Sequence, residues 1–231
     1  MLDNIGDFDE FADGYESSLT SALGMFGGEN SYFTTRKVEI IAEKAVIQNH
    51  FRILDYGCGI GLLTGILREQ FPEAEIWGTD ISATSMKIAK MNSPTMVEAN
   101  DDELPLGHFD YVVLSNVLHH VSPGSRNNLL VKISKTLKKK GKIIVFEHNK
   151  LNPVTRKIVD RCEFDVGVEL LSKGSCTRMF DESGSFEVID SGYFLVFPPI
   201  LKKLRHLESF INKLPVGAQF WLLAELSDSY R

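Results

Sequence analysis

Three alternating glycines follow a short apolar run that ends in a carboxylate. The stretch reads ILDYGCGIG, with Asp55 followed by Gly57, Gly59 and Gly61. Glycine has no Cβ and tolerates positive φ, so such a turn can lie directly against a ligand. The helix-like run from Gly61 to Phe71 points its unpaired N-terminal N–H groups at the same place. The sequence therefore predicts a small-molecule site at the carboxyl end of a first strand.

Two acids narrow the chemistry of that ligand. A dinucleotide fingerprint, G-x-G-x-x-G, needs a glycine at position 62, where this chain has Leu62. Asp55 would repel a pyrophosphate but suits a cationic group such as an amino-acid ammonium. Asp80 ends a second apolar run, 74–81, at the spacing where an acid accepts ribose hydroxyls. The alternative is a glycine-rich turn that merely connects a strand to a helix.

The motifs together resemble a known family. DYGCGIG is similar to motif I of the class I S-adenosylmethionine (SAM) methyltransferases, E/D-x-G-x-G-x-G, and Asp80 matches their ribose-binding acid. The stretch from Glu98 to Val121 resembles the part of that family that runs from the third strand through the fourth. The resemblance covers roughly residues 34–149 and is closest in style to the ubiquinone-type and other small-molecule enzymes. The segment FDEFADGYE, 8–16, also fits that group.

The resemblance implies both an activity and a set of cofactor contacts. It implies methyl transfer from SAM to a small polar or amphiphilic acceptor, which we expect to occur at oxygen. The methionine portion would be lined by Asp55, Gly57, Cys58, Gly59 and Gly61, and the ribose by Asp80 and Ile81. The adenine would be flanked by Asn100 and Asp101, and the sulfonium end would lie above Ser115. Cys58 has packing in the turn as its alternative role.

Three histidines are candidates for the catalytic base that a hydroxyl acceptor requires. His119 and His120 follow the fourth strand and His148 follows the fifth. Adjacent residues point in different directions, so at most one of His119 and His120 faces the substrate. Each histidine has a cap or a structural hydrogen bond as its alternative role. Histidines so placed can also bind a metal, but no matching acid cluster accompanies them, and we expect no metal.

The segment that follows the fifth strand has its own signature. EHNKLNPVTRKIVDRCEFD, 147–165, looks like a segment of some bacterial class I methyltransferases of unassigned substrate. Its polar residues Asn149, Asn152 and Arg156 are candidates to orient a polar substrate. The alternative is a hydrogen-bond network that stabilises the loop, with an asparagine turn.

Composition excludes several classes of function. The 231 residues are 43% hydrophobic, which suits one large domain, and the net charge of −6 argues against general affinity for nucleic acid. Three scattered cysteines form no C-x-x-C pair, so neither a disulfide framework nor a zinc site is indicated. No apolar run approaches about 18 residues and the N-terminus has no signal-like pattern, so we expect a cytoplasmic protein.

Strand and helix signals alternate along the middle of the chain. Strands are expected at 51–56, 75–80, 95–99, 109–114, 142–147, 186–197 and 218–226, and helices at 34–49, 61–71, 82–92, 124–138 and 200–214. Ser82 and the pair Ser122-Pro123 mark helix starts, and Gly141 the end of the helix before it. This alternation predicts an α/β fold with helices on both faces of a parallel sheet.

The resemblance extends this to a Rossmann-like three-layer sandwich, with a mostly parallel seven-stranded sheet and an antiparallel C-terminal strand. We expect one methyltransferase domain over 1–231. Its parts are an N-terminal helical cover (1–49), a SAM-binding core (50–149), an active-site cover of short helices (150–184) and a C-terminal β-hairpin with an inserted helix (185–231).

The last expected helix, 200–214, carries an apolar stripe flanked by basic residues. It can pack on the domain or on a second subunit of a homodimer, or it can make a weak contact with an anionic membrane surface.

Rival classes of function remain. Nucleic-acid amino-methyltransferases carry the motif N/D-P-P-Y/F where this chain has Ser115–Leu118, which disfavours that class of enzyme. The remaining alternatives are a SAM-binding protein without catalysis and an NAD-dependent oxidoreductase.

Overall fold

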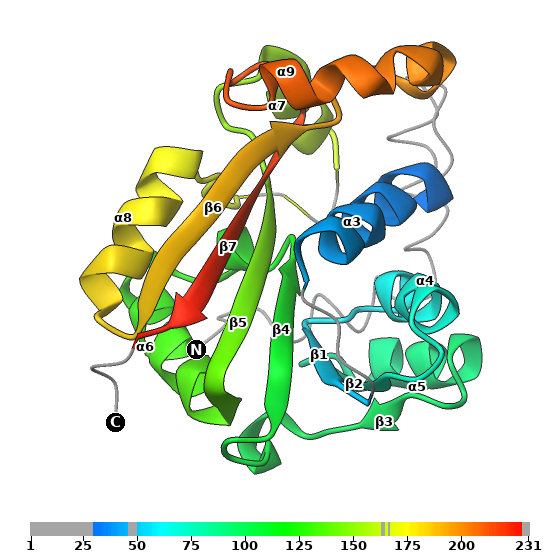
Figure 1. Ribbon diagram of the computed structural model, residues 1–231, viewed down its shortest axis with the longest axis vertical. Coiled ribbons are helices and arrows are strands. Elements are labelled where there is room, and N and C mark those ends of the chain that lie inside the picture. Colours follow the sequence, from blue (N-terminus) through cyan, green and yellow to red (C-terminus); the bar gives the residue numbers. More distant parts are fainter. Residues whose placement is uncertain (1–29, 46–49, 163–164, 166, 228–231) are drawn as a thin grey trace.

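The computed structural model describes residues 30–45, 50–162, 165 and 167–227 (Figure 1). The segment 8–16 that fits the small-molecule methyltransferases lies outside these residues. The helices are α3 (Asn30–Lys44), α4 (Leu62–Gln70), α5 (Ala83–Asn92), α6 (Pro123–Thr136), α7 (Pro153–Val159), α8 (Lys173–Ser183) and α9 (Glu208–Ile211). The strands are β1 (Arg52–Tyr56), β2 (Glu75–Thr79), β3 (Val97–Glu98), β4 (Phe109–Ser115), β5 (Leu137–His148), β6 (Phe186–Phe194) and β7 (Gln219–Leu226).

The described strands form one sheet in the order β3-β2-β1-β4-β5-β7-β6. The pairs from β3 across to β5 are parallel, and β7 runs antiparallel to both of its neighbours, β5 and β6. The prediction of a mostly parallel seven-stranded sheet with an antiparallel C-terminal strand is confirmed. The strand order reverses direction between β1 and β4, and ligands of open α/β sheets bind at the carboxyl ends of the strands at such a point.

Side chains of the central strands alternate between two apolar layers because successive residues of a strand face opposite sides. Val112 and Leu114 of β4 belong to one cluster with residues of α6 and α8. Tyr111 and Val113 belong to the other cluster, with residues of α3 and α4. Helices therefore cover both faces of the sheet, as Figure 1 shows, and the three-layer sandwich is confirmed.

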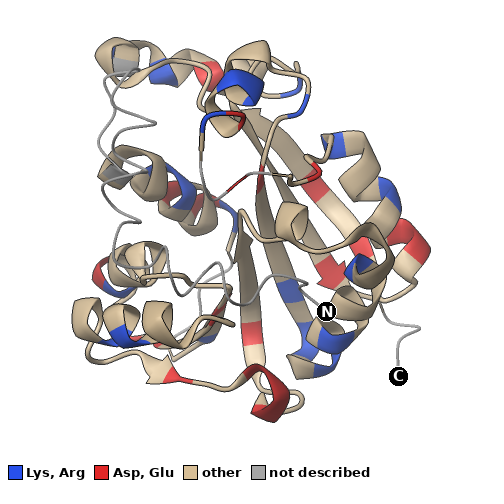
Figure 2. Cartoon of the chain, turned by 180° about the vertical axis from the view of Figure 1, so that it is seen from behind, with Lys and Arg blue, Asp and Glu red and all other residues tan. Residues whose placement is uncertain are grey.

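The prediction that Gly141 ends helix α6, with the lysines in its last turn, is wrong. The helix ends at Thr136, and β5 begins at Leu137, which is buried and pairs with Phe109 of β4. The lysine run belongs to the start of β5 instead of a helix end, and Lys138 pairs with Asp110 of β4 at 2.7 Å. Figure 2 shows these basic residues at the start of β5, far from α7 and α9.

The prediction of one continuous helix over 200–214 is also wrong. Residues Pro199–Leu207 form a 3₁₀ segment with non-helical backbone at Leu201, and only the short α9 follows. In the region 150–184 that was expected to cover the site, α8 packs against α6, β6 and β7, whereas Thr155 and Ile158 of α7 line the cavity described below. The expected cap at Ser82 is confirmed, because its hydroxyl accepts the Ser85 N–H.

Among the described residues, no helix combines the length and the apolar character that crossing a membrane requires.

Candidate active site

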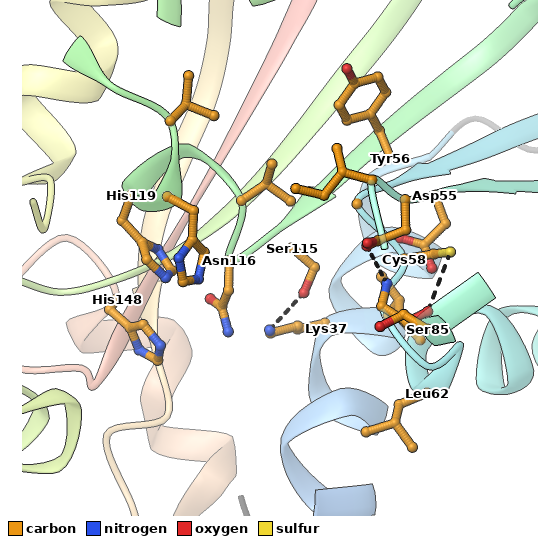
Figure 3. A pocket seen from close by; sticks show the side chains of 18 of the residues that line it. Lys37, Asp55, Tyr56, Cys58, Leu62, Ser85, Ser115, Asn116, His119 and His148 are labelled. Carbon is orange, nitrogen blue, oxygen red and sulfur yellow. Dashed lines mark hydrogen bonds between the residues drawn. The ribbon is translucent and has the colours of Figure 1, made fainter. Parts of the chain in front are cut away.

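A cavity of about 690 Å³ lies at the carboxyl ends of β1, β2, β4 and β5 (Figure 3). Its lining includes Gly57 and Gly59 of the glycine turn with Asp55 and Asp80 on one side and the three histidines on the other, whereas Gly61 is not part of the lining. Between them lie Lys37 and Ser115. The cavity therefore joins the expected cofactor residues to the expected catalytic residues.

The glycine turn adopts backbone conformations that other residues take only with strain. Gly57, Gly59 and Gly61 have φ of 73°, 53° and 81°. Gly61 also packs tightly, because a Cβ there would lie 3.0 Å from the Ala89 backbone of α5. Cys58 lines the cavity, yet its Sγ lies 3.6 Å from the Met86 sulfur in a small buried cluster, in agreement with a packing role.

Asp55 is almost fully buried at the end of β1. Its Oδ2 accepts the Thr64 hydroxyl at 2.7 Å, whereas Oδ1 has no hydrogen-bond partner among the described residues. Burial raises the pKa of this carboxyl to about 6, and the nearby Asp80 adds to the increase. A cationic donor from a ligand would satisfy Oδ1 and stabilise the ionised form of Asp55.

Asp80 fixes the other side of the turn. Its two carboxylate oxygens accept the Gly59 N–H at 2.8 Å and the Ser82 N–H at 2.9 Å. Asp80 also lines the cavity, where a carboxylate can accept hydrogen bonds from ribose hydroxyls. Ile81 also lines the cavity.

The two residues expected near the adenine differ in their placement. Asp101 lines the cavity and pairs with Lys132 of α6 at 2.8 Å. Asn100 is exposed, is not part of the lining, and its side chain accepts the Asp102 N–H. Asp101 is therefore better placed than Asn100 for a contact with the base.

Lys37 is a site residue that the sequence analysis missed. It projects from α3 into the cavity, and its ammonium donates to the Ser115 hydroxyl at 2.8 Å (Figure 3). Burial lowers the pKa of Lys37 to about 8, against the opposing influence of Glu147 and Asp55. A sequence signal existed: Lys37 stands midway between Phe33 and Ile41, on the side of the helix that faces the core.

His119 is enclosed by two carboxylates. Its Nδ1 lies 2.5 Å from Glu147 Oε2, and its Nε2 lies 3.4 Å from Asp165 Oδ1. The other oxygen of Glu147 accepts the Leu118 N–H at 2.7 Å, so this buried carboxylate is fully engaged. Burial lowers the pKa of His119, but Glu147 and Asp165 outweigh it and raise the pKa to about 9.

His120 and His148 lie next to His119 and reach the same cavity. The ring centroid of His120 lies 4.2 Å from the ring centroid of His119, and the ring centroid of His148 lies 5.3 Å from it. Burial, and then the charge on His119, lowers the pKa of both His120 and His148 to about 4. Contrary to the expectation that one of the adjacent pair faces away, His119 and His120 both line the cavity.

Asp165 was missed as well, because nothing in its local sequence marks it. It comes from the segment after α7, and its Oδ1 lies 3.4 Å from both His119 Nε2 and His120 Nε2. Burial raises the pKa of Asp165, but the three histidines outweigh it and lower the pKa to about 2. The site therefore brings two acids, Glu147 and Asp165, to the histidines, whereas the sequence analysis found no matching acid cluster.

The asparagines of the 147–165 segment stabilise the loop. Asn149 donates to the Gly217 and Pro215 carbonyls and accepts the Leu151 N–H. Asn152 caps α7 through the Val154 and Thr155 N–H groups. Neither residue lines the cavity, and Arg156 is exposed outside it. The loop-stabilising role is therefore the one that the contacts of both asparagines support.

Comparison with known proteins agrees with this geometry. Residues 54–145 match the model of a methyltransferase domain. The ribosomal protein L11 methyltransferase of Paraburkholderia phytofirmans is 34% identical over 99 residues, which are 41% of this chain and 32% of that protein. The ubiquinone/menaquinone biosynthesis C-methyltransferase UbiE of Ralstonia pickettii is 24% identical over 132 residues, 53% of this chain and 54% of that protein.

The fold has solved counterparts too. A SAM-dependent methyltransferase from Archaeoglobus fulgidus superposes with a TM-score of 0.61 at 16% identity, covering 88% of this chain and 97% of that one. The chain spans about half or less of the length of the two sequence relatives. They therefore support the type of domain, and their named acceptors differ from one another.

Proposed function

We propose that this chain, whose residues 54–145 match a methyltransferase domain, transfers the methyl group of SAM to an oxygen of a small polar or amphiphilic acceptor. The observation that carries the proposal is the single cavity that runs from Asp55 past Lys37 to His148. Its volume of about 690 Å³ lies within the range usual for small-molecule sites.

The cofactor half of the cavity fits SAM by its donor and acceptor groups. The orphaned Asp55 Oδ1 suits the ammonium, Asp80 suits the ribose hydroxyls, and the glycine turn lets the backbone approach closely. SAM supplies a methyl group already activated by the sulfonium. The chain's contribution is then mainly to position the acceptor in line with that methyl group.

The acceptor half offers a base and a cation. We assign the base to His148, because both ring nitrogens of His119 face carboxylates while His148 lies at the cavity wall, with its Nδ1 3.4 Å from the Gln219 amide. The acceptor hydroxyl gives its proton to this imidazole as its oxygen bonds to the methyl carbon. The carbon–sulfur bond breaks, and its electron pair stays on sulfur as S-adenosylhomocysteine. Lys37 would hold a polar or anionic group of the acceptor.

Methyl transfer from SAM labelled with ¹³C in its methyl group tests the proposal. The purified protein is incubated with fractionated metabolite pools, and the ¹³C chemical shift of the product separates O-methyl, N-methyl and C-methyl groups. With the acceptor so found, His148→Ala should lower kcat by about 10²–10⁴-fold while the Kd for SAM stays unchanged. His206→Ala, an exposed histidine outside the cavity, is the matched control.

The other outcomes identify the alternatives. SAM binding without any labelled product would favour a non-catalytic SAM-binding protein, and binding of NAD in place of SAM would favour an oxidoreductase. A C-methyl product would overturn the assignment to oxygen but leave the methyltransferase. An unchanged kcat in His148→Ala would remove His148 as the base and favour catalysis by positioning alone.

A further inference from the structure

Three potential metal ligands converge at the acceptor end of the cavity. Each of His119, His120 and Asp165 offers one ligand atom, and these three atoms lie within 4.8 Å of one another. Two come from the turn after β4 and one from the segment after α7, so the fold brings together residues about 45 positions apart in the sequence. Two imidazoles and a carboxylate form a donor set typical of catalytic zinc and non-haem iron sites.

Glu147 orients the first of these ligands. Its carboxylate binds Nδ1 of His119 and is itself fixed by the Leu118 N–H. Nε2 of the same ring is buried and has no hydrogen-bond partner among the described residues. A histidine that donates one ring nitrogen to a carboxylate and presents the other is the usual arrangement around a bound metal.

The distances from Asp165 to the two histidines also fit a shared ion better than direct hydrogen bonds. Asp165 Oδ1 lies 3.4 Å from His119 Nε2 and 3.4 Å from His120 Nε2. Good N–H···O hydrogen bonds are shorter, about 2.7–3.2 Å. Two ligands of a tetrahedral zinc ion with bonds of about 2.0–2.1 Å lie roughly 3.4 Å apart.

We propose that His119 Nε2, His120 Nε2 and Asp165 bind a divalent transition-metal ion, and Zn²⁺ is an ion whose ligand spacing the two 3.4 Å distances match. All three residues line the cavity, so the remaining coordination position faces the acceptor space. An ion there would hold an acceptor oxygen and lower the pKa of its proton. The inference replaces the expectation of no metal, which rested on the lack of an acid that Asp165 now supplies. Metal binding itself does not depend on the proposed methyl transfer.

Calorimetric titration of the metal-free protein with ZnCl₂, and separately with MnCl₂, tests the site without SAM or acceptor. We expect one ion per chain for zinc. Asp165→Asn and His120→Ala should each weaken zinc binding by more than 100-fold, because each removes a ligand. Glu147→Gln should weaken it by about 10–100-fold, the effect usual for a residue that orients a metal-bound histidine. His206→Ala, which removes an exposed histidine, should leave the affinity unchanged.

Substitution with Co²⁺ gives an independent readout, because its visible absorption reports nitrogen and oxygen ligands and is strongest in tetrahedral sites. The spectrum should appear in the wild type and be lost in Asp165→Asn, with circular dichroism confirming that the variant is folded. Absence of zinc binding in the wild type would overturn the proposal. So would equal affinities of the wild type, Asp165→Asn and His120→Ala, since the ion would then bind elsewhere.

Discussion

The buried carboxyl of Asp55 should make cofactor binding depend on pH. Burial raises its pKa to about 6, so it is ionised above that pH and neutral below it. Only the ionised form attracts an ammonium, and SAM binding should therefore weaken as the pH falls through about 6, by up to about tenfold per pH unit. Calorimetry with SAM on either side of that pH measures the effect.

Asp55→Asn supplies the control for this prediction. It should bind SAM weakly and with little change across the same pH range, because no charge is left to titrate at that position. Asp160→Asn, at an exposed carboxyl outside the cavity, should keep the wild-type dependence. A wild-type affinity that does not change through about pH 6 would contradict the role of Asp55.

Local patterns indicated residues on one side of the cavity, Asp55, the glycine turn and Asp80, but not the residues that surround the histidines. Asp55, the glycine turn and Asp80 belong to short motifs whose geometry is set by neighbouring residues. Lys37 and Asp165 reach the cavity only through the packing of α3 and of the segment after α7. The Glu147–His119 contact likewise joins residues 28 positions apart. No periodicity or spacing encodes such a contact.

At the scale of elements, the turn between β1 and α4 should respond unequally to added methyl groups. Gly59→Ala places its Cβ in open space and should cost only the left-handed backbone conformation, about 1–2 kcal/mol of unfolding free energy. Gly61→Ala has the same backbone cost and also presses on α5 at Ala89. Urea unfolding without ligand should therefore rank Gly61→Ala as the less stable variant. Equal losses of unfolding free energy in the two variants would mean that α5 shifts to accommodate the added methyl group at no cost.

The segment 199–214 is docked on one side and exposed on the other. Buried Glu208 accepts the Val196 N–H and lies 3.5 Å from Arg36 of α3, and Arg205 pairs with Glu39 of the same helix. Ile200 and Phe210 nevertheless remain 87% and 82% exposed. The segment lies beside α7 in Figure 1, at the edge of the sheet that holds the cavity.

This exposed apolar side, with its basic neighbours, leads us to expect weak binding to anionic lipid. The protein should co-sediment with anionic vesicles at low salt and be released at high salt. The double variant Ile200→Ser/Phe210→Ser should lose this binding, whereas Met91→Ser, at a residue of α5 that is 78% exposed, should retain it. If the wild type fails to sediment at low salt, the membrane contact is excluded. Light scattering would then test the homodimer.

At the scale of the whole molecule, the cofactor should stabilise the fold by mass action. A ligand present at about 100 times its Kd adds about 2.7 kcal/mol to the unfolding free energy. For a chain of this size that is a rise of roughly 5–10 °C in melting temperature. SAM and S-adenosylhomocysteine should both produce this rise in a thermal melt and NAD should not. A shift with NAD alone would contradict the assignment of the domain.

The architecture was more predictable than the details of its elements. Alternating strands and helices specify a parallel sheet covered on both faces, because each element must bury its apolar side. The predicted boundaries of β5 and of the helix at 200–214 were wrong because contacts between elements, and not local sequence, set them. Pairing of Leu137 with Phe109 extends the strand, and docking of Glu208 and Arg205 on α3 accompanies the break at Leu201.

The place of β7 between β5 and β6 has a consequence for how the protein is made. A ribosome releases β5 and β6 before β7, yet each pairs with β7 in the finished sheet. Until residues 219–226 emerge, β6 is an unpaired strand with open hydrogen-bonding edges, and such edges recruit other chains. A chain that stalls before Gln219 would therefore be prone to aggregate, and it would also lack the amide beside His148. Completion of the sheet and completion of the proposed acceptor site thus coincide, when residues 219–226 emerge.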